Sequence, residues 1–276
     1  MSKKHNVFLV LAATLCLLSG CSIDKESQPI EDVHHLDGQN IGVMLAWGPD
    51  YALTGRDDLK LTRYNRVADM IMALCYHRID AIAIEDAFSP EILSSVSGIR
   101  KLEDPVAEDG LVAITATDQN ALLEEFNAFI AEFQNTEDYE DLLKRSRDPD
   151  GYDYKVVPLA EGDKVLKVGI TDDNYPFTYI DFQTKEYAGI DVEVLRHFAN
   201  KYGYKIEFSG GTWEAMSMDI SYKNVDIALS GISDLYRDDY VLADAALVSD
   251  VYLPVNIVLI EVEDLDALKI ISAIEY

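Results

Sequence analysis

The residues best suited to binding chemistry lie in one short stretch of the second half of the chain. Val225–Leu229 is an apolar run of the kind that forms a buried strand. Ser230-Gly231-Ile232-Ser233 follows it directly, and Arg237 comes soon after. Small hydroxyl groups and open backbone N–H groups beside a guanidinium can hold a carboxylate. The stretch therefore predicts a site that binds a small anionic or zwitterionic molecule and does not transform it.

Similar patterns in the two halves of the chain predict the framework for this site. Ile41-Gly42-Val43 and Val168-Gly169-Ile170 are similar strand openings, and a helix followed by a short strand comes later in each half, with Arg78–Ala83 as that strand in the first. Strands that alternate with helices favour an α/β fold of two lobes, each with a mostly parallel sheet flanked by helices. Ligands of such sheets bind beyond the carboxyl ends of the strands, where Ser230 and Glu85 fall.

Helical patterns and a loop-like stretch predict where the two lobes divide. Asp118–Gln134 and Asn135–Ser146 are predicted to form amphipathic helices, the second with an acidic start. Arg147–Val157 contains a proline and a glycine and is the predicted linker. The expected lobes are residues 36–155 and residues 160–276.

The N-terminus predicts an address outside the cytoplasm. Two lysines precede the apolar run Val7–Leu18, which closes with Leu18-Ser19-Gly20-Cys21. This pattern is a secretory signal over residues 1–20, and its ending resembles the bacterial lipobox, in which the cysteine is lipidated. We expect Cys21 to anchor the protein to the membrane through lipid alone, ahead of a flexible tether at residues 21–35. The alternative is an ordinary signal peptide with a chance cysteine.

Charge and motif content argue against several classes of function. The chain has 50 acidic and 23 basic residues, a formal net charge of −27. Such a surface repels nucleic acid and anionic lipid headgroups, so neither is an expected partner. The histidines lack metal-ligand spacing, and no nucleophile or phosphate-loop motif is present. We therefore expect neither an enzyme nor a cofactor or metal.

Three motifs stand in order within Lys167–Leu259: Tyr175-Pro176-Phe177, Gly189-Ile190-Asp191 and Ser230-Gly231-Ile232-Ser233. With them this stretch resembles the first lobe of a known family, the bacterial extracellular solute-binding proteins, family 3, which are the amino-acid-binding lipoproteins of ABC importers. Residues 36–146 resemble its second lobe. The lobes therefore stand in reversed order, which leaves two alternatives open: a permuted two-lobed binder, or a shortened piece of a tandem protein.

The resemblance implies roles for individual residues. It assigns Arg237, with the hydroxyls of Ser230 and Ser233, to the α-carboxylate of an amino acid, although the loop is one residue shorter here than in the family. The alternative is a surface arginine paired with a neighbouring aspartate, Asp234 or Asp238. The resemblance further implies that the ligand side chain lies beside Asn174, Tyr175 and Trp213. It implies that the ligand ammonium lies beside Glu85, with Asp86 adjacent.

The expected function follows from this resemblance. It is a lipid-anchored protein on the extracytoplasmic face of the membrane that captures an amino acid or a similar zwitterion and delivers it to an ABC permease. The alternative is a degenerate or sensor-type lipoprotein that uses the fold for signalling or for protein partners without transport.

Overall fold

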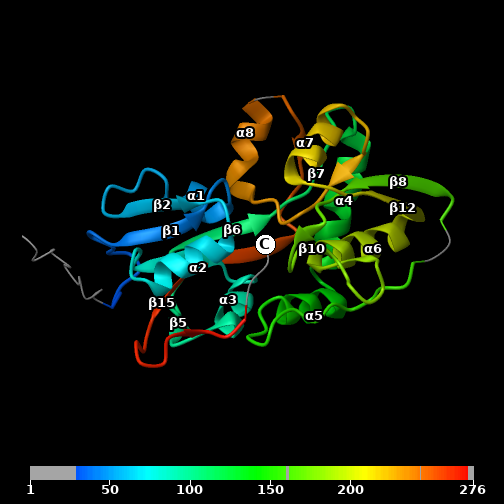
Figure 1. The fold of residues 1–276 in the computed structure, drawn as a ribbon. Helices are drawn as coiled ribbons and strands as arrows, with labels where there is room; N and C mark the ends of the chain where they lie inside the picture. The colour runs from blue at the N-terminus through cyan, green and yellow to red at the C-terminus, as the bar shows by residue number, and fades with distance from the viewer. Residues whose placement is uncertain (1–28, 160–161, 243, 273–276) are drawn as a thin grey trace, which may run out of the picture.

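Two separate β-sheets, each covered by helices, organise the chain (Figure 1). The computed structural model describes residues 29–159, 162–242 and 244–272. The predicted signal peptide, the lipidation residue Cys21 and the first part of the predicted tether lie outside these residues. Among the helices of the described ranges, none is both long and apolar enough to cross a membrane.

The first sheet forms the core of lobe A, which we define as residues 36–111 and 253–262. Its strands are, across the sheet, β2 (Lys60–Tyr64), β1 (Asn40–Met44), β3 (Ala81–Glu85), β15 (Leu253–Val262) and β5 (Ile99–Lys101), with β6 (Ala107–Leu111) also paired to β15. The β2–β1–β3 part is parallel, and β15 runs antiparallel to all its partners.

Alternation along the strands gives the lobe A sheet an apolar layer on each face. In β3, Ile82 and Ile84 join the cluster under α2 (Val67–Cys75) and α3 (Ser89–Ser95), while Ala81 and Ala83 join the opposite cluster with α1 (Gly48–Leu53). A two-stranded ribbon of β4 (Val96–Ser97) and β16 (Lys269–Ile270) extends the lobe at one edge.

The flexible tether predicted at residues 21–35 is wrong for residues 29–35, which are the part of it that the structure describes. Ile30, Val33 and Leu36 are buried against lobe A, and the backbone N–H of Ile30 donates to Oε2 of Glu261 at 2.9 Å. These spaced apolar side chains cover sheet surface that would otherwise face water. Residues 29–35 are therefore part of the folded unit.

The second sheet forms the core of lobe B, which we define as residues 112–230 and 247–252. Its strands are β12 (Tyr204–Ser209), β8 (Lys164–Gly169), β13 (Ile227–Ala228), β7 (Ile114–Thr115) and β14 (Leu247–Val248). A small sheet of β9 (Asp173–Asn174), β10 (Thr178–Ile180) and β11 (Tyr187–Ala188) adjoins it. The helices are α4 (Asn120–Phe133), α5 (Glu137–Arg145), α6 (Ile190–Tyr202) and α7 (Trp213–Ser221).

The fold class is confirmed as two α/β lobes, but "mostly parallel" holds for only part of each sheet. The three parallel strands β12, β8 and β13 are followed by β7 and β14, which pair antiparallel, and lobe A repeats this plan. The antiparallel strands are the ones next to the crossings between the lobes. Strands β7 and β15 each enter from the other lobe and run opposite to the parallel strands, whereas β14 and β6 lead out of their lobes and run in the same direction as the parallel strands.

The division of the chain between the lobes differs from the predicted boundary at residues 155–160. Helices α4 and α5 belong to lobe B, since Phe126 and Phe129 of α4 contact Phe198 of α6 with ring centroids 5.1 and 5.5 Å apart. Conversely, β15 lies in the sheet of lobe A. The amphipathic pattern of α4 specifies an apolar face but not the sheet that face covers.

The lobes are joined by two chain crossings that lie side by side. Strand β6 leads out of lobe A toward β7, and β15 returns from β14, with Leu111 opposite Leu253 in the antiparallel register (Figure 1). Two paired strands between two domains are a hinge geometry that lets the domains rotate against each other. Residues 231–242 and 244–246, which we call the bridging segment, also lie between the lobes. It contains the 3₁₀ turn η1 (Asp234–Tyr236) and α8 (Arg237–Leu242).

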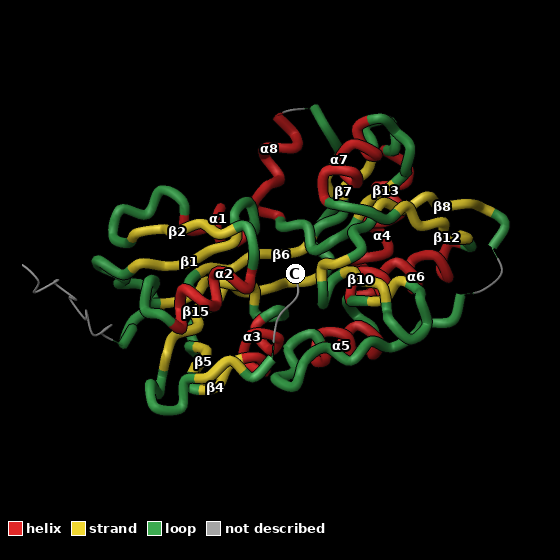
Figure 2. The backbone as a smooth tube through the Cα atoms, viewed as in Figure 1, coloured by secondary structure: helices red, strands yellow, loops and turns green. Residues whose placement is uncertain are grey.

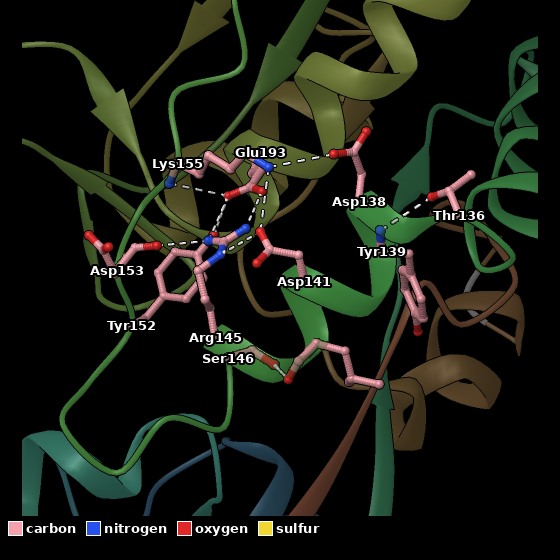
Figure 3. Close-up of polar contacts among 11 residues, drawn as sticks. Thr136, Asp138, Tyr139, Asp141, Arg145, Ser146, Tyr152, Asp153, Lys155 and Glu193 are labelled. Atoms are coloured by element: carbon pink, nitrogen blue, oxygen red, sulfur yellow. Dashed lines mark hydrogen bonds and ion pairs between the residues drawn. The ribbon is translucent and has the colours of Figure 1, made fainter.

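The predicted linker is a loop that lobe B holds tightly. Residues 146–159 form no helix or strand (Figure 2). The carboxylate of Glu193 on α6 accepts bonds from Arg145 at 2.5 and 3.1 Å and from the Tyr152 hydroxyl at 2.6 Å, and Arg145 also donates to the carbonyl of Asp153 (Figure 3). This network fixes the end of α5 and the start of the loop onto α6.

Candidate functional site

A cavity of about 450 Å³ lies between the two lobes and is lined by both of them. Lobe A contributes the ends of β1 and β3 and the starts of α1 and α2, and lobe B contributes residues near β9 and the start of α7. The bridging segment closes one side with Gly231, Ser233 and Tyr236. The cavity therefore lies at the carboxyl ends of parallel strands, the usual ligand position in open α/β sheets, and its size suits a small molecule.

The structure brings five of the eight predicted ligand-binding residues to this cavity and leaves three outside its lining. The lining contains Glu85, Asn174, Trp213, Ser230 and Ser233. Of the others, Asp86 accepts a hydrogen bond from the Asn256 side chain at 3.1 Å, and the Tyr175 hydroxyl bonds with the backbone of Tyr152 at 3.2 and 3.4 Å. Arg237 is engaged elsewhere.

Arg237 lies outside the cavity lining and bonds to other protein groups. Its Nε donates to Oδ1 of Asp234 at 2.6 Å, and a terminal nitrogen donates to the carbonyl of Ser249 at 2.6 Å. The alternative of an arginine paired with a neighbouring aspartate is the one that the structure has. The short spacing between Ser233 and Arg237 is occupied by the turn η1, whose first residue is Asp234, so the guanidinium meets that carboxylate first.

Buried hydrogen bonds hold the Ser230-Gly231 loop in place, and they use the hydroxyl that was predicted to contact the ligand. The Ser230 hydroxyl is fully buried and bonds with Thr171 and Thr178 at 2.5 and 2.8 Å. Gly231 has φ +62°, and a Cβ there would lie 2.6 Å from the Phe177 ring. Ser230 therefore shapes the cavity wall, and its hydroxyl is not free for a ligand carboxylate.

Asp191 is a positioning residue that the sequence reasoning missed. It is buried on α6 and accepts bonds from the Gly231 backbone N–H and the Tyr252 hydroxyl, both at 2.7 Å. Burial raises the pKa of Asp191 to about 7. Asp191 stands in the segment quoted for the family resemblance, but only the structure shows that it holds the loop of the cavity.

Three oxygens converge on the start of α1, where Gly48 leaves room for them. A Cβ at Gly48 would lie 2.7 Å from Oδ2 of Asp109, 3.2 Å from Oγ of Ser233 and 3.3 Å from Oε1 of Glu85. The Ser233 hydroxyl bonds with Oδ2 of Asp109 at 2.6 Å. Asp109 was missed because it lies on β6, an antiparallel strand that the repeat pattern does not predict. Asp109 thus lies close to Glu85, which lines the cavity, so two acidic groups are near each other here.

Glu85 is the least satisfied polar group of the cavity. The residue is only 6% exposed, and its Oε2 is buried with no hydrogen-bond partner. Burial, with the Asp109 and Asp86 carboxylates nearby, raises the pKa of Glu85 to about 8. An unpartnered buried carboxyl is costly, and a donor group of a ligand at this position would satisfy it.

Aromatic rings form a further part of the lining. Trp47, Phe177, Trp213 and Tyr236 contribute rings, and Trp47 and Tyr236 are further residues that the sequence reasoning missed. The Tyr236 hydroxyl donates to the Trp47 carbonyl at 3.1 Å and so ties the bridging segment to lobe A. A tryptophan just after the first predicted strand was a usable signal, because that strand end faces the site.

Stability is expected to fall as the pH rises from about 5 to 8. Glu85 and Asp191 have folded-state pKa values raised to about 8 and about 7, so in this window the native state still holds protons that the unfolded chain has already released at lower pH. Asp58, whose pKa is lowered to about 2, is ionised in both states here and does not contribute. Urea unfolding at pH 5 and pH 8 measures the difference. A free energy of unfolding that increases over this range would contradict the burial of the two acids.

Within the described residues, no group of three or more His, Cys, Asp or Glu side chains could hold a metal ion. The free Cys75 is only partly buried and lies on α2, away from the cavity lining.

Comparison with known proteins identifies one segment of the chain. Residues 166–243 match the family model of the bacterial extracellular solute-binding proteins, family 3. The L-cystine-binding protein TcyA of Bacillus subtilis is 33% identical over 75 residues, which are 27% of this chain and 28% of that protein. A cyclohexadienyl dehydratase of Pseudomonas aeruginosa is 38% identical over 71 residues, 25% of each chain.

The chain thus matches only about a quarter of the length of these relatives. Among solved structures, the probable amino-acid ABC transporter extracellular-binding protein ytmK from Bacillus subtilis superposes with a TM-score of 0.42 and 10% identity, covering 82% of this chain and 84% of the other. The matched segment, 166–243, runs from β8 to the end of α8 and supplies the lobe B wall of the cavity and most of the bridging segment.

Proposed function

The chain carries, in residues 166–243, a segment of the bacterial extracellular solute-binding proteins, family 3, and from this premise we propose that it captures a small solute between its lobes. The observation that carries the proposal is the cavity of about 450 Å³ whose walls come from both lobes beside a two-strand hinge. Rotation about such a hinge would close the lobes over a ligand and remove it from water, which strengthens its polar contacts.

Of the two alternatives for the lobe order, we propose the permuted binder. Each lobe has its own sheet, and lobe A uses strands from both ends of the described chain, β1 and β15. Since both walls of the cavity belong to this one chain, the reversed order does not prevent a two-walled site. Glu85 would receive a donor group of the ligand, as the family resemblance implies for this position.

The expected setting follows the family. We propose an extracytoplasmic protein, lipidated at Cys21, that passes its solute to an ABC permease. The sensor or protein-partner role stays a prediction of the sequence.

A second candidate function is acid catalysis, which one observation favours. A buried carboxyl with a pKa near 8 is protonated at neutral pH and can serve as a general acid, and one partial relative is a dehydratase. Incubation with a cyclohexadienyl substrate and chromatographic detection of product would distinguish turnover from binding. Product formation that depends on Glu85 would replace binding with catalysis as the function.

Differential scanning fluorimetry against a panel of small solutes tests the primary proposal. A ligand that binds only the native state raises the melting temperature by mass action. We expect at least one class of amine-bearing solute to raise it in a saturable manner. A panel of amino acids, amines and dicarboxylates that leaves the transition unmoved would contradict the proposal.

Arg237→Ala is expected to change stability slightly and ligand affinity hardly at all. The side chain is about one-third exposed and pairs with Asp234, so its loss should cost on the order of 1 kcal/mol. Affinity is measured by calorimetry on the purified variant with a solute that shifts the wild-type transition. A drop in affinity of about a hundredfold or more would show that Arg237 turns to grip the ligand, as the family resemblance implies.

A further inference from the structure

The charge of the cavity points to a class of ligand that the family resemblance does not give. The lining contains the acidic side chains of Glu85, Asp173 and Glu214, and none of its described residues is a lysine or an arginine. We infer that this site takes an organic cation, recognised by its ammonium group and its apolar body, and does not require a ligand carboxylate. The inference rests on the proposed function and names the substrate class of that same site.

Two basic side chains near the cavity are engaged in ion pairs. Arg237 on the bridging segment is held by Asp234 and the Ser249 carbonyl. Arg63 on β2 donates to the buried carboxylate of Asp50 at 2.8 Å. The exposed Arg66 stands between the lining residues Asn65 and Val67 but is not itself a lining residue. A carboxylate entering the cavity would therefore meet the acidic side chains of the lining without a lysine or arginine in that lining to offset them, which disfavours its binding.

The acidic side offers a specific acceptor for a cation. Glu85 is more than nine-tenths buried, lines the cavity, and has an Oε2 that no described group satisfies. An ammonium has donors and no acceptor, and its bond to a carboxylate is charge-assisted. Asp109 lies close to Glu85, next to Gly48, and its carboxylate adds to the negative potential around Glu85.

The aromatic lining suits the body of such a ligand. Trp47 comes from lobe A, Trp213 and Phe177 come from lobe B, and Tyr236 comes from the bridging segment. Aromatic faces attract organic cations electrostatically and also bury the alkyl or aryl part of the molecule. The cavity thus offers rings from every side together with carboxyl groups.

Binding a cation at Glu85 has a consequence for protons. The carboxyl is protonated at neutral pH in the empty site because of its burial, so an incoming ammonium displaces one proton. The titratable groups on the elements packed around it are Asp109 on β6, Asp86 after β3, Asp50 on α1 and Tyr236 on η1. Burial also raises the pKa of Asp109, so the number of protons that a ligand displaces is a property of Glu85 and Asp109 together.

Isothermal titration calorimetry with matched pairs of ligands tests the inference. Each pair compares an amine with its α-carboxylated counterpart: 2-phenylethylamine with L-phenylalanine, and cadaverine with L-lysine. We expect the amine of at least one pair to bind about tenfold or more tightly than its counterpart. Its affinity should rise by up to about tenfold per pH unit between pH 6 and pH 8 as the Glu85 proton becomes easier to displace.

Two variants distinguish the loss of a ligand contact from a general loss of folding. Glu85→Gln should weaken the amine about a hundredfold and reduce the pH dependence, since Asp109 remains. Glu91→Gln, at a partly buried glutamate of lobe A whose pKa is also raised, should change neither. Tighter binding of the carboxylated member in every pair that binds would overturn the cation inference and leave solute binding standing. Binding of neither member by any pair, with folded protein, would overturn both.

Discussion

Glu85→Gln is expected to bind an amine about a hundredfold more weakly than the wild type and yet to unfold at higher urea concentration at pH 8. The affinity falls because glutamine keeps the shape of the side chain but removes the charge that meets the ammonium, a loss of ~2.7 kcal/mol. The stability rises because the wild-type carboxyl is buried with Oε2 unsatisfied and must either hold a proton or bear an uncompensated charge.

The two effects have opposite signs, so a variant that is merely destabilised cannot produce both of them. At pH 8 the neutral amide should gain ~1–3 kcal/mol in the free energy of unfolding, and the gain should shrink toward pH 5, where the wild-type acid is protonated in the folded state. Calorimetry and urea denaturation on the same preparations measure the two quantities. A variant that loses stability along with affinity would indicate that Glu85 is a structural partner and not a ligand acceptor.

Glu193→Ala is expected to cost about 3–5 kcal/mol in the free energy of unfolding. Glu193 is 1% exposed and is bonded by Arg145 and by the Tyr152 hydroxyl (Figure 3). The side chain of Arg145 is only 14% exposed, so removal of Glu193 leaves a largely buried guanidinium without its buried partner. The other carboxylate that Arg145 contacts, Asp141, is half exposed and cannot replace that partner. The loop after α5 would lose its attachment to α6.

Two companion variants separate the buried pair from its surroundings. Asp141→Asn removes an exposed i,i+4 contact to the same arginine and should cost less than about 1 kcal/mol. Tyr152→Phe removes one buried hydrogen bond and should cost about 1–2 kcal/mol. Urea unfolding curves monitored by circular dichroism give all three values. Equal losses for Glu193→Ala and Asp141→Asn would contradict the importance given to the buried carboxylate.

Local features of the fold could be predicted from the sequence because short-range physics determines them. The apolar stripe at Val67, Met70, Ile71 and Leu74 forms the buried face of α2, and Thr136 caps α5 through the Tyr139 N–H. Strand ends such as Glu85 also fall where the repeated pattern places them.

The assignment of elements to lobes could not be predicted in the same way. An amphipathic helix such as α4 specifies how much surface it buries but not which sheet it covers, and β15 carries the apolar pattern of any buried strand. The family order of lobes therefore led to a boundary near residue 155, whereas the chain crosses twice, near residues 112 and 252.

The site shows the same limit at the level of single residues. Arg237 has the right type for a carboxylate grip, but its partner depends on the turn at Asp234, which tertiary packing sets. Glu85 was placed correctly at a strand end, while its burial and missing partner depend on Asp109 and α1, which are distant in sequence. Residue type and spacing predict a candidate, and only the surrounding elements decide its charge state and its accessibility.

The central claim is that a small organic cation binds between the lobes, and the chain contains a direct reporter of this. Its two tryptophans, Trp47 and Trp213, line the cavity from opposite lobes. The decisive measurement is a fluorescence titration with cadaverine or 2-phenylethylamine, carried out on the wild type and on Trp47→Phe and Trp213→Phe. We expect a saturable change from the tryptophan that remains in each variant, and a wild-type Kd that Glu85→Gln weakens about a hundredfold. Fluorescence that never saturates, or that responds equally in Glu85→Gln, would contradict it.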